Sequence, residues 1–346
     1  MLWAFVSCLT VPVLIRMTGF VSDNLMVHLM VISLLHFMVR IHQNWLLAKE
    51  KIIAFNVIAV IHPVAMSLLL VVFFVVMKWH TVAAFVAAYY ATTVLSLLAS
   101  SVYMIKNKAL RFSWNIRQSL RASFRLGYVI QAGNLLQLLN YRFAFYLLQN
   151  FYGKFQVGLY SMAVAFAESS WMIANSFATI QYARISNSVD DVSNVRVTVT
   201  FLRMALWLTL IPVAVLLALP AGFFRYFLSQ EFAQLPQIIP WLAPGILFVV
   251  VSITISHYYS GSGNPKIGFI GSAVGFAVTM ALGFYLVSTY GITGAALTAT
   301  LSYGASAATV LYFFTRKNKL TLKDFMPTRK DIEFLKALGK QPGSMG

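Results

Sequence analysis

Residues 139–186 read LNYRFAFYLLQNFYGKFQVGLYSMAVAFAESSWMIANSFATIQYARIS. Two apolar runs meet in this stretch, on either side of a short turn at 151–154, and they extend over 125–149 and 155–181. Each run exceeds the roughly 20 residues that a helix needs to cross the hydrocarbon core of a bilayer. The stretch therefore predicts two consecutive membrane-spanning helices that carry a few polar side chains.

The composition of the whole chain extends this interpretation to most of its length. Apolar residues make up 60% of the 346 residues and charged residues 10%, whereas a soluble domain carries about 25% charged residues. The runs lack the alternation of polar and apolar residues expected of membrane barrel strands. We predict an all-α integral membrane protein with about ten transmembrane helices, at 1–16, 23–46, 53–77, 82–104, 125–149, 155–181, 200–219, 236–258, 267–289 and 292–315.

The basic residues indicate an orientation in the membrane. With the N-terminus placed in the cytoplasm, twenty of the 26 Lys and Arg residues fall on the cytoplasmic side and four on the other, and Arg40 and Arg142 lie inside spans. Cytoplasmic loops of membrane proteins are enriched in Lys and Arg. We expect a multi-pass protein of a bacterial inner membrane with both termini in the cytoplasm. The net charge of +17 is not gathered on a polar nucleic-acid-binding domain, so no nucleic-acid partner is expected.

The longest internal basic segment divides the chain into parts. Residues 1–104 are expected to form a partial N-terminal lobe of four helices, and 105–124 a basic cytoplasmic connector that membrane lipids contact. Residues 125–315 are expected to form a C-terminal lobe of six helices, and 316–346 a cytoplasmic tail.

Charged groups inside the spans are the strongest functional candidates, because a charge in the membrane costs about 2.5 kcal/mol or more. Eight of the nine acidic residues lie in loops, near helix ends or in the tail, and the ninth, Glu168, lies mid-span. Arg142 lies in the preceding span at a depth that differs by roughly 8 Å, a gap that a long arginine side chain can largely close. We hypothesise that Arg142 and Glu168 are partners in a central cavity. A purely structural ion pair is the alternative.

Further polar residues follow the same helical faces. Asn134, Gln137 and Tyr141 share an arc with Arg142, and Asn175 shares the face of Glu168. In the second span, His36 and Arg40 lie on one polar arc. Arg40 is equally explained as an arginine that reaches the lipid headgroups. Together these residues form the predicted substrate and ion pathway, in which two arginines suit an anionic cargo such as a diphosphate.

Motifs of catalysis and cofactor binding are not found in the sequence. It contains no phosphate-binding loop of the Walker type, no zinc or nucleophile motif, and six histidines without the spacing of metal ligands. We therefore expect a protein that is not an enzyme and has no cofactor or metal.

The quoted stretch resembles the polysaccharide flippases of the MATE-like, oligosaccharidyl-lipid exporter superfamily. Their seventh helix ends in an "NYR" pattern, matched by Asn140–Arg142, and their eighth carries "vGlYs…A…aE", matched up to Glu168. The segments 231–247, 260–266 and 290–303 also resemble the last three helices of that family. The resemblance covers about residues 20–315.

The resemblance implies two lobes of helices around a central cavity with alternating access. It also implies a cargo of oligosaccharide on undecaprenyl diphosphate. Two departures stand out: Ala144 replaces an aspartate of many relatives, which argues against ion coupling at that position, and the first lobe lacks two helices. We therefore expect a MATE-like bundle with an incomplete first lobe.

These observations favour a flippase that moves lipid-linked oligosaccharide from the cytoplasmic to the outer leaflet for polysaccharide biosynthesis. Glycan polymerase and glycosyltransferases are the expected protein partners. Two alternatives remain: a cation-coupled multidrug exporter of the same fold, and a non-transporting membrane scaffold for glycan assembly.

Overall fold

The computed structural model describes residues 23–106 and 116–326, and the predicted first span at 1–16 lies outside them. Seven helices in the described residues are long and apolar enough to cross a membrane. Two of these, α5 and α9, are each interrupted by one glycine, so the described part contains nine membrane-length helical segments. With the first span outside the described residues, this agrees with the prediction of about ten helices in an all-α membrane protein.

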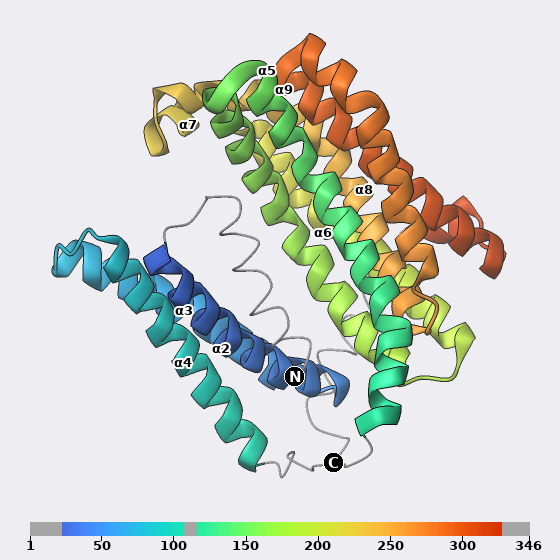
Figure 1. The fold of residues 1–346 in the computed structure, drawn as a ribbon. Coiled ribbons are helices and arrows are strands. Elements are labelled where there is room, and N and C mark those ends of the chain that lie inside the picture. Colours follow the sequence, from blue (N-terminus) through green and yellow to red (C-terminus); the bar gives the residue numbers. More distant parts are fainter. Residues whose placement is uncertain (1–22, 107–115, 327–346) are drawn as a thin grey trace. The chain divides into compact units, whose positions relative to one another are not determined.

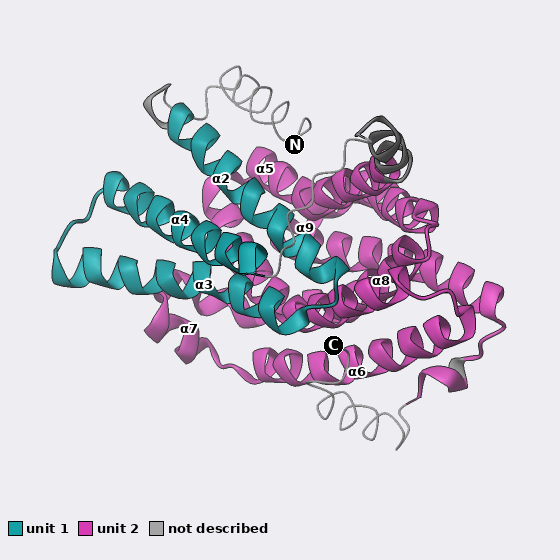
Figure 2. Cartoon of the chain, turned by 90° about the horizontal axis from the view of Figure 1, so that it is seen from below, with its two compact units in different colours: residues 1–115 teal, residues 116–346 magenta. Residues whose placement is uncertain are grey.

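The chain divides into two compact units, residues 1–115 (unit 1) and 116–346 (unit 2), which are coloured separately in Figure 2. The described part of unit 1 consists of three helices. They are α2 (Asp23–Ala48), α3 (Ile52–Val71), which continues as the π-helical segment η1 (Val72–Val76), and α4 (Val82–Lys106). Helix α4 packs against both α2 and α3.

Small residues allow this packing in unit 1. Helix α4 buries a row of them at intervals of four residues: Ala84, Ala88, Thr92, Ser96 and Ser100. Residues four apart lie on one face of a helix, and small side chains let membrane helices approach closely. The row of small residues therefore explains the close packing of α4 on both α2 and α3.

Unit 2 is built around two long helices that each turn back at a glycine. Helix α5 (Ile116–Ser186) is broken at Gly153 (φ 81°, ψ −178°), and α9 (Lys266–Asn318) at Gly291 (φ 58°, ψ −128°). Residues with a Cβ atom rarely adopt such positive φ values. Each glycine thus lets two membrane-spanning segments follow one another almost without a loop, as Figure 1 shows for α5 and α9.

The remaining elements of unit 2 lie between these two helices in the sequence. They are α6 (Asp191–Ala218), the short α7 (Ala221–Phe227), the 3₁₀ turn η2 (Gln230–Gln234), and α8 (Leu235–Gly261). A second 3₁₀ turn, η3 (Leu322–Phe325), follows α9. Helices α5, α8 and α9 pack against one another, and α6 packs on α5 and α8.

The structure differs most from the predicted boundaries at the start of α6 and at the two ends of the basic connector. Helix α6 begins at Asp191, nine residues before the predicted span, because Asp190 caps it by accepting a hydrogen bond from the Val192 amide at 3.0 Å. The predicted basic connector 105–124 is shorter, since α4 runs to Lys106 and α5 starts at Ile116. The spans were predicted from runs of apolar residues, which cover only the part of a helix that lies in lipid. The polar ends of the helices were therefore assigned to loops.

Candidate substrate-binding site

Arg142 and Glu168 form an ion pair across the two halves of α5. Arg142 Nη2 donates a hydrogen bond to Glu168 Oε2 at 3.3 Å and lies 3.3 Å from Oε1. The contact to Oε1 lacks hydrogen-bond geometry, and Oε1 has no other partner among the described residues. The Gly153 turn sets the two segments antiparallel and brings the two side chains to similar depth. The contact expected from the sequence is therefore present, while its role stays a prediction.

The guanidinium group of Arg142 keeps much of its binding capacity. The side chain is 46% exposed, that of Glu168 is 27% exposed, and the guanidinium carbon lies 5.5 Å from the centre of the Phe145 ring. A guanidinium has five N–H donors, and one of them donates to Glu168. Within the described residues no further hydrogen bond of this side chain occurs. The remaining donors are available to an anionic ligand.

A cluster of aromatic rings holds the surrounding helices together. The Tyr141 ring centre lies 5.0 Å from that of Trp171 and 5.4 Å from that of Tyr303. These residues come from the first half of α5, the second half of α5 and the second half of α9. Such aromatic contacts each contribute about 0.5–1.5 kcal/mol beyond the burial of area. Tyr141, a predicted pathway residue next to Arg142 in the sequence, thus packs among aromatic rings of α5 and α9.

The other predicted polar residues of α5 form no hydrogen bond with Arg142 or Glu168. Asn134 and Asn175 are exposed, and neither side chain forms a hydrogen bond with the described residues. Gln137 accepts a hydrogen bond from the hydroxyl of Ser272 on α9 at 3.1 Å. Gln137 therefore joins two helices, and the structure gives it a packing contact that the sequence did not indicate.

The predicted residues of unit 1 lie close together on α2. Arg40 donates to the side-chain oxygen of Gln43 at 3.2 Å, and the His36 ring lies edge-on to the His62 ring with centres 5.6 Å apart. His62 in turn contacts the Tyr89 ring at 5.0 Å. Among the described residues no group of three or more possible metal ligands occurs. Unit 1 thus has a polar cluster of its own.

Sequence reasoning missed a polar contact between α5 and α9. Asn140 is 2% exposed, and its side-chain oxygen accepts a hydrogen bond from the hydroxyl of Thr279. Its amide nitrogen and the hydroxyl of Ser306 lie beside Gly275, where they have no partner among the described residues. Asn140 lies about 200° around the helix from Arg142. It was therefore outside the polar arc of Arg142 that was used to predict pathway residues. The buried threonine on the facing helix was the available signal.

Comparison with known proteins identifies the fold. The MATE transporter VcmN of Vibrio cholerae, in the crystal structure of a variant, superposes with a TM-score of 0.77 at 15% identity, over 94% of this chain and 77% of that one. The lipid II flippase MurJ in its inward closed conformation superposes with a TM-score of 0.62 at 18% identity, over 99% of this chain and 75% of that one. The chain is a multi-pass membrane protein with a MATE-like fold, as the resemblance implied.

Sequence comparison gives one relative at lower coverage. The capsular polysaccharide biosynthesis protein CapF of Staphylococcus aureus is 21% identical over 172 residues, which are 49% of this chain and 43% of CapF. The match thus spans less than half the length of that relative. No family model matches the chain.

Proposed function

We propose that this protein carries a lipid-linked oligosaccharide with a diphosphate group across a bacterial inner membrane, from the cytoplasmic to the outer leaflet. The diphosphate binds at Arg142 while the hydrocarbon tail stays in lipid. Glycan polymerase and glycosyltransferases are the proposed partners that use and supply this cargo.

The exposed guanidinium of Arg142 is the observation that carries this proposal. An arginine side chain that pointed into lipid would cost about 2.5 kcal/mol or more. An arginine that served only a buried structural ion pair would need protein partners for its remaining donors to offset the cost of desolvation. Here Arg142 is 46% exposed and has unused donors. A guanidinium binds phosphate oxygens in a bidentate manner, so a water-filled cavity that receives a diphosphate explains both the exposure and the charge.

The compared proteins support this choice of cargo. The fold is shared with a protein named as a lipid II flippase, and a sequence match, though partial, leads to a capsular polysaccharide biosynthesis protein. One name thus points to the flipping of a lipid and the other to the synthesis of a polysaccharide. The cytoplasmic position of both chain termini, proposed from the distribution of Lys and Arg, gives the direction of transport.

Transport in proteoliposomes tests the proposal directly. The full chain is reconstituted with an undecaprenyl-diphosphate-linked oligosaccharide that carries a nitrobenzoxadiazole fluorophore on the sugar, and dithionite added outside bleaches the fluorophore only in the outer leaflet. We expect bleaching to continue beyond the outer-leaflet fraction with the intact protein. Arg142→Ala should slow this phase at least tenfold, because loss of charge-assisted hydrogen bonds costs about 1.5–3 kcal/mol and 1.4 kcal/mol corresponds to a factor of ten.

Arg225→Ala is the matched control, since Arg225 is an exposed arginine at the end of α7 and should leave the rate unchanged. Normal transport by Arg142→Ala would remove this residue from the mechanism. Absence of any transport by the intact protein, in vesicles that retain the folded chain, would contradict the proposed function.

A cation-coupled multidrug exporter is the second candidate, because MATE transporters share this fold. An exporter of cationic drugs needs acidic groups in its cavity. In the described spans Glu168 is the acid placed mid-helix, and it is paired with Arg142. Efflux of ethidium from the same vesicles, faster with the protein than without it and abolished by Glu168→Gln, would favour this candidate over the flippase.

A further inference from the structure

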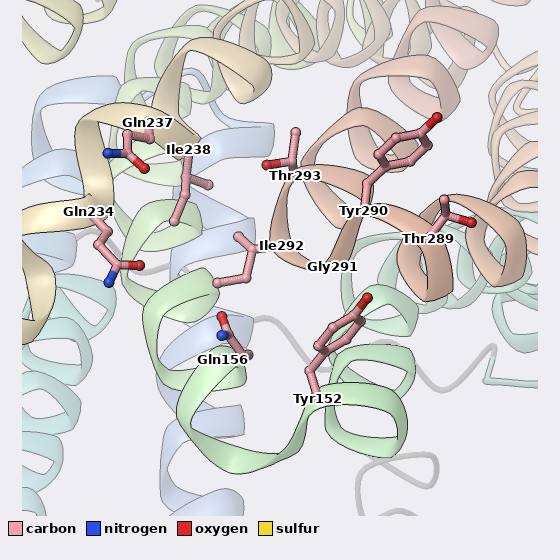
Figure 3. Close-up of a pocket in the computed structure, with 10 residues that line it drawn as sticks. All are labelled: Tyr152, Gln156, Gln234, Gln237, Ile238, Thr289, Tyr290, Gly291, Ile292 and Thr293. Carbon is pink, nitrogen blue, oxygen red and sulfur yellow. The ribbon is translucent and has the colours of Figure 1, made fainter.

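A polar pocket lies in unit 2, away from the ion pair. It is formed where the Gly153 and Gly291 turns meet the start of α8, and its volume is about 410 Å³. Figure 3 shows glutamines from η2 and α8 on one side and tyrosines from the two turns on the other. This volume lies in the range of about 300–1,000 Å³ typical of small-molecule sites.

The lining of the pocket is polar and uncharged. Gln156, Gln234 and Gln237 contribute three side-chain amides, and Thr289 and Thr293 contribute hydroxyls. Within the described part of the chain the three amides form no hydrogen bond. An amide offers both donors and acceptors, so the pocket presents unused groups of both kinds to a ligand.

Two tyrosines add flat apolar surfaces to this lining. The hydroxyl of Tyr152 donates to the backbone carbonyl of Ser288 at 2.9 Å, which fixes its ring above the Gly291 turn. Tyr290 is 55% exposed. A ring with a polar tip and an apolar face is suited to stack on the C–H face of a sugar ring. Interfacial enrichment of tyrosine accounts for such rings in part, but it does not account for three unpaired amides beside them.

The chemistry of the lining excludes most other ligands. A phosphate or a carboxylate is normally met by Arg or Lys, and an organic cation by acidic groups. None of the residues that line this pocket is charged. A neutral, polyhydroxylated molecule matches a site made of amides, hydroxyls and aromatic faces.

The position of the pocket relates it to the proposed cargo. Basic residues of unit 2 lie at the opposite helix ends, with Arg184 in the last turn of α5 and Lys266 and Lys317 at the two ends of α9. By the positive-inside rule the pocket then lies on the outer side. We propose that this pocket binds neutral sugar units of the transported oligosaccharide as they reach the outer face, an inference that rests on the proposed function for the origin of the sugar.

Ligand-observed NMR on the full chain in lipid nanodiscs tests the pocket without transport. Saturation-transfer difference signals are measured for three neutral probes, N,N′-diacetylchitobiose, maltotriose and lactose, and for the charged probe inorganic diphosphate. We expect at least one neutral probe to bind, and the double variant Gln156→Ala/Gln237→Ala to weaken this binding at least tenfold. Gln149→Ala is the matched control, because Gln149 is an exposed glutamine on the same helix outside the pocket and should leave binding unchanged.

The outcomes separate this inference from the proposed function. Sugar binding that the pocket variants lose and that Arg142→Ala keeps supports the pocket, even if the vesicle assay shows no transport. Absence of signal for all three neutral probes overturns it. Equal weakening by Gln149→Ala and the pocket variants also overturns it. Sugar binding that is lost only in Arg142→Ala overturns it as well, because the sugar then binds at the ion pair.

Discussion

Asn140 and Arg142 are two residues apart on α5 but lie on different faces of the helix. The face determines whether each polar side chain is buried or exposed. Asn140 is buried and bonded to Thr279 on α9, whereas Arg142 is exposed and paired with Glu168. Both are polar groups in a membrane span, where an unpaired group is costly. The first serves helix packing, and the second has donors left for a ligand.

Gly294 is a residue at which a single methyl group should disturb the fold. A Cβ atom there would lie 1.8 Å from the backbone carbonyl oxygen of Leu286 on the other half of α9, and this oxygen cannot rotate away. We expect Gly294→Ala to lower the free energy of unfolding by about 1–3 kcal/mol and the melting temperature by several degrees. Thermal unfolding in detergent measures the change.

Gly158→Ala is the control for this prediction, because no atom lies within 4 Å of a Cβ atom at that helical position. Alanine is about 1 kcal/mol more favourable than glycine in a helix, so the control should melt at the same temperature or higher. Equal melting of the two variants would contradict the close approach at Gly294.

Asp324 in η3 provides a pH-dependent contact outside the membrane spans. The Thr321 amide donates to its carboxylate at 2.7 Å and the Thr321 hydroxyl at 2.9 Å, and these two hydrogen bonds hold the pKa of Asp324 below its usual value. A lowered pKa in the folded state means that the cap is stabilising above the ordinary aspartate pKa and is lost as the pH falls through the lowered value.

We expect Thr321→Val to raise the pKa of Asp324 toward its usual value, because one of the two hydrogen bonds is removed. A pH titration of the Asp324 carboxyl carbon by NMR measures the pKa. Lys323→Ala, which leaves both hydrogen bonds intact, should keep the pKa low. A titration curve that is the same in Thr321→Val and the intact protein would show that the cap does not set this pKa.

The sequence predicted some site residues and missed others for a common reason. Arg142 and Glu168 were found because charges are rare in membrane spans and their depths are fixed by the rise of a helix. The hydrogen bonds of Gln137 with Ser272 and of Asn140 with Thr279 were not predicted, because a sequence without contacts does not say which face of α5 meets α9. The amides of the pocket lie near helix ends, with Gln234 in η2 and Gln156 and Gln237 in the first turns of helical segments. Polar residues are common at helix ends, so the sequence alone did not single these glutamines out.

At the scale of elements, one buried glutamine joins three helices of unit 2. The side-chain nitrogen of Gln181 on α5 donates to the hydroxyl of Thr198 on α6 and to the carbonyl oxygen of Thr254 on α8, each at 3.1 Å. Gln181 is completely buried. Hydrogen bonds between membrane helices average about 0.6 kcal/mol and reach about 1.7 kcal/mol.

We expect Gln181→Leu to reduce stability by about 1–2 kcal/mol, since two such hydrogen bonds are lost, and to lower the melting temperature by a few degrees. Gln131→Leu, at an exposed glutamine on the same helix, should leave the melting temperature unchanged. If the melting temperature of Gln181→Leu is no lower than that of Gln131→Leu, the hydrogen bonds of Gln181 do not contribute and packing alone holds α5, α6 and α8 together.

Element boundaries were predicted well where apolar residues reach the helix ends and poorly where polar residues do. The predicted span 236–258 corresponds to α8 at Leu235–Gly261, whereas the predicted span 200–219 omits the polar start of α6 at Asp191. The short α7 and η2 were not predicted, because seven or fewer residues give too little periodicity. The turn at 151–154 was predicted, whereas the sequence alone did not show that Gly153 and Gly291 carry the backbone breaks.

For the whole molecule, orientation in the membrane is the property that remains to be measured. Lys154 follows the Gly153 turn and Lys266 begins α9, so they lie at opposite ends of the helices of unit 2. Cys8 is the one cysteine of the chain, which makes a cysteine-free background available through Cys8→Ser.

We expect Lys154→Cys in this background to react with an impermeant maleimide in intact cells, and Lys266→Cys to react only after the membrane is opened. The reason is the excess of Lys and Arg on the side of Lys266. The Cys8→Ser protein alone should not react. Labelling with the reverse pattern would place the termini outside and invert the proposed direction of transport.

The two turns of unit 2, at Gly153 and Gly291, depend on glycine, the one achiral amino acid. At φ values of 81° and 58° any L-residue carries a backbone strain of about 1–3 kcal/mol, even though no atom stands within 4 Å of a Cβ at Gly153. We therefore expect any substitution of these two glycines to be poorly tolerated. At the lipid-facing positions around them, one apolar residue can replace another. Over generations these two sites should change least, because the backbone at both positions requires glycine.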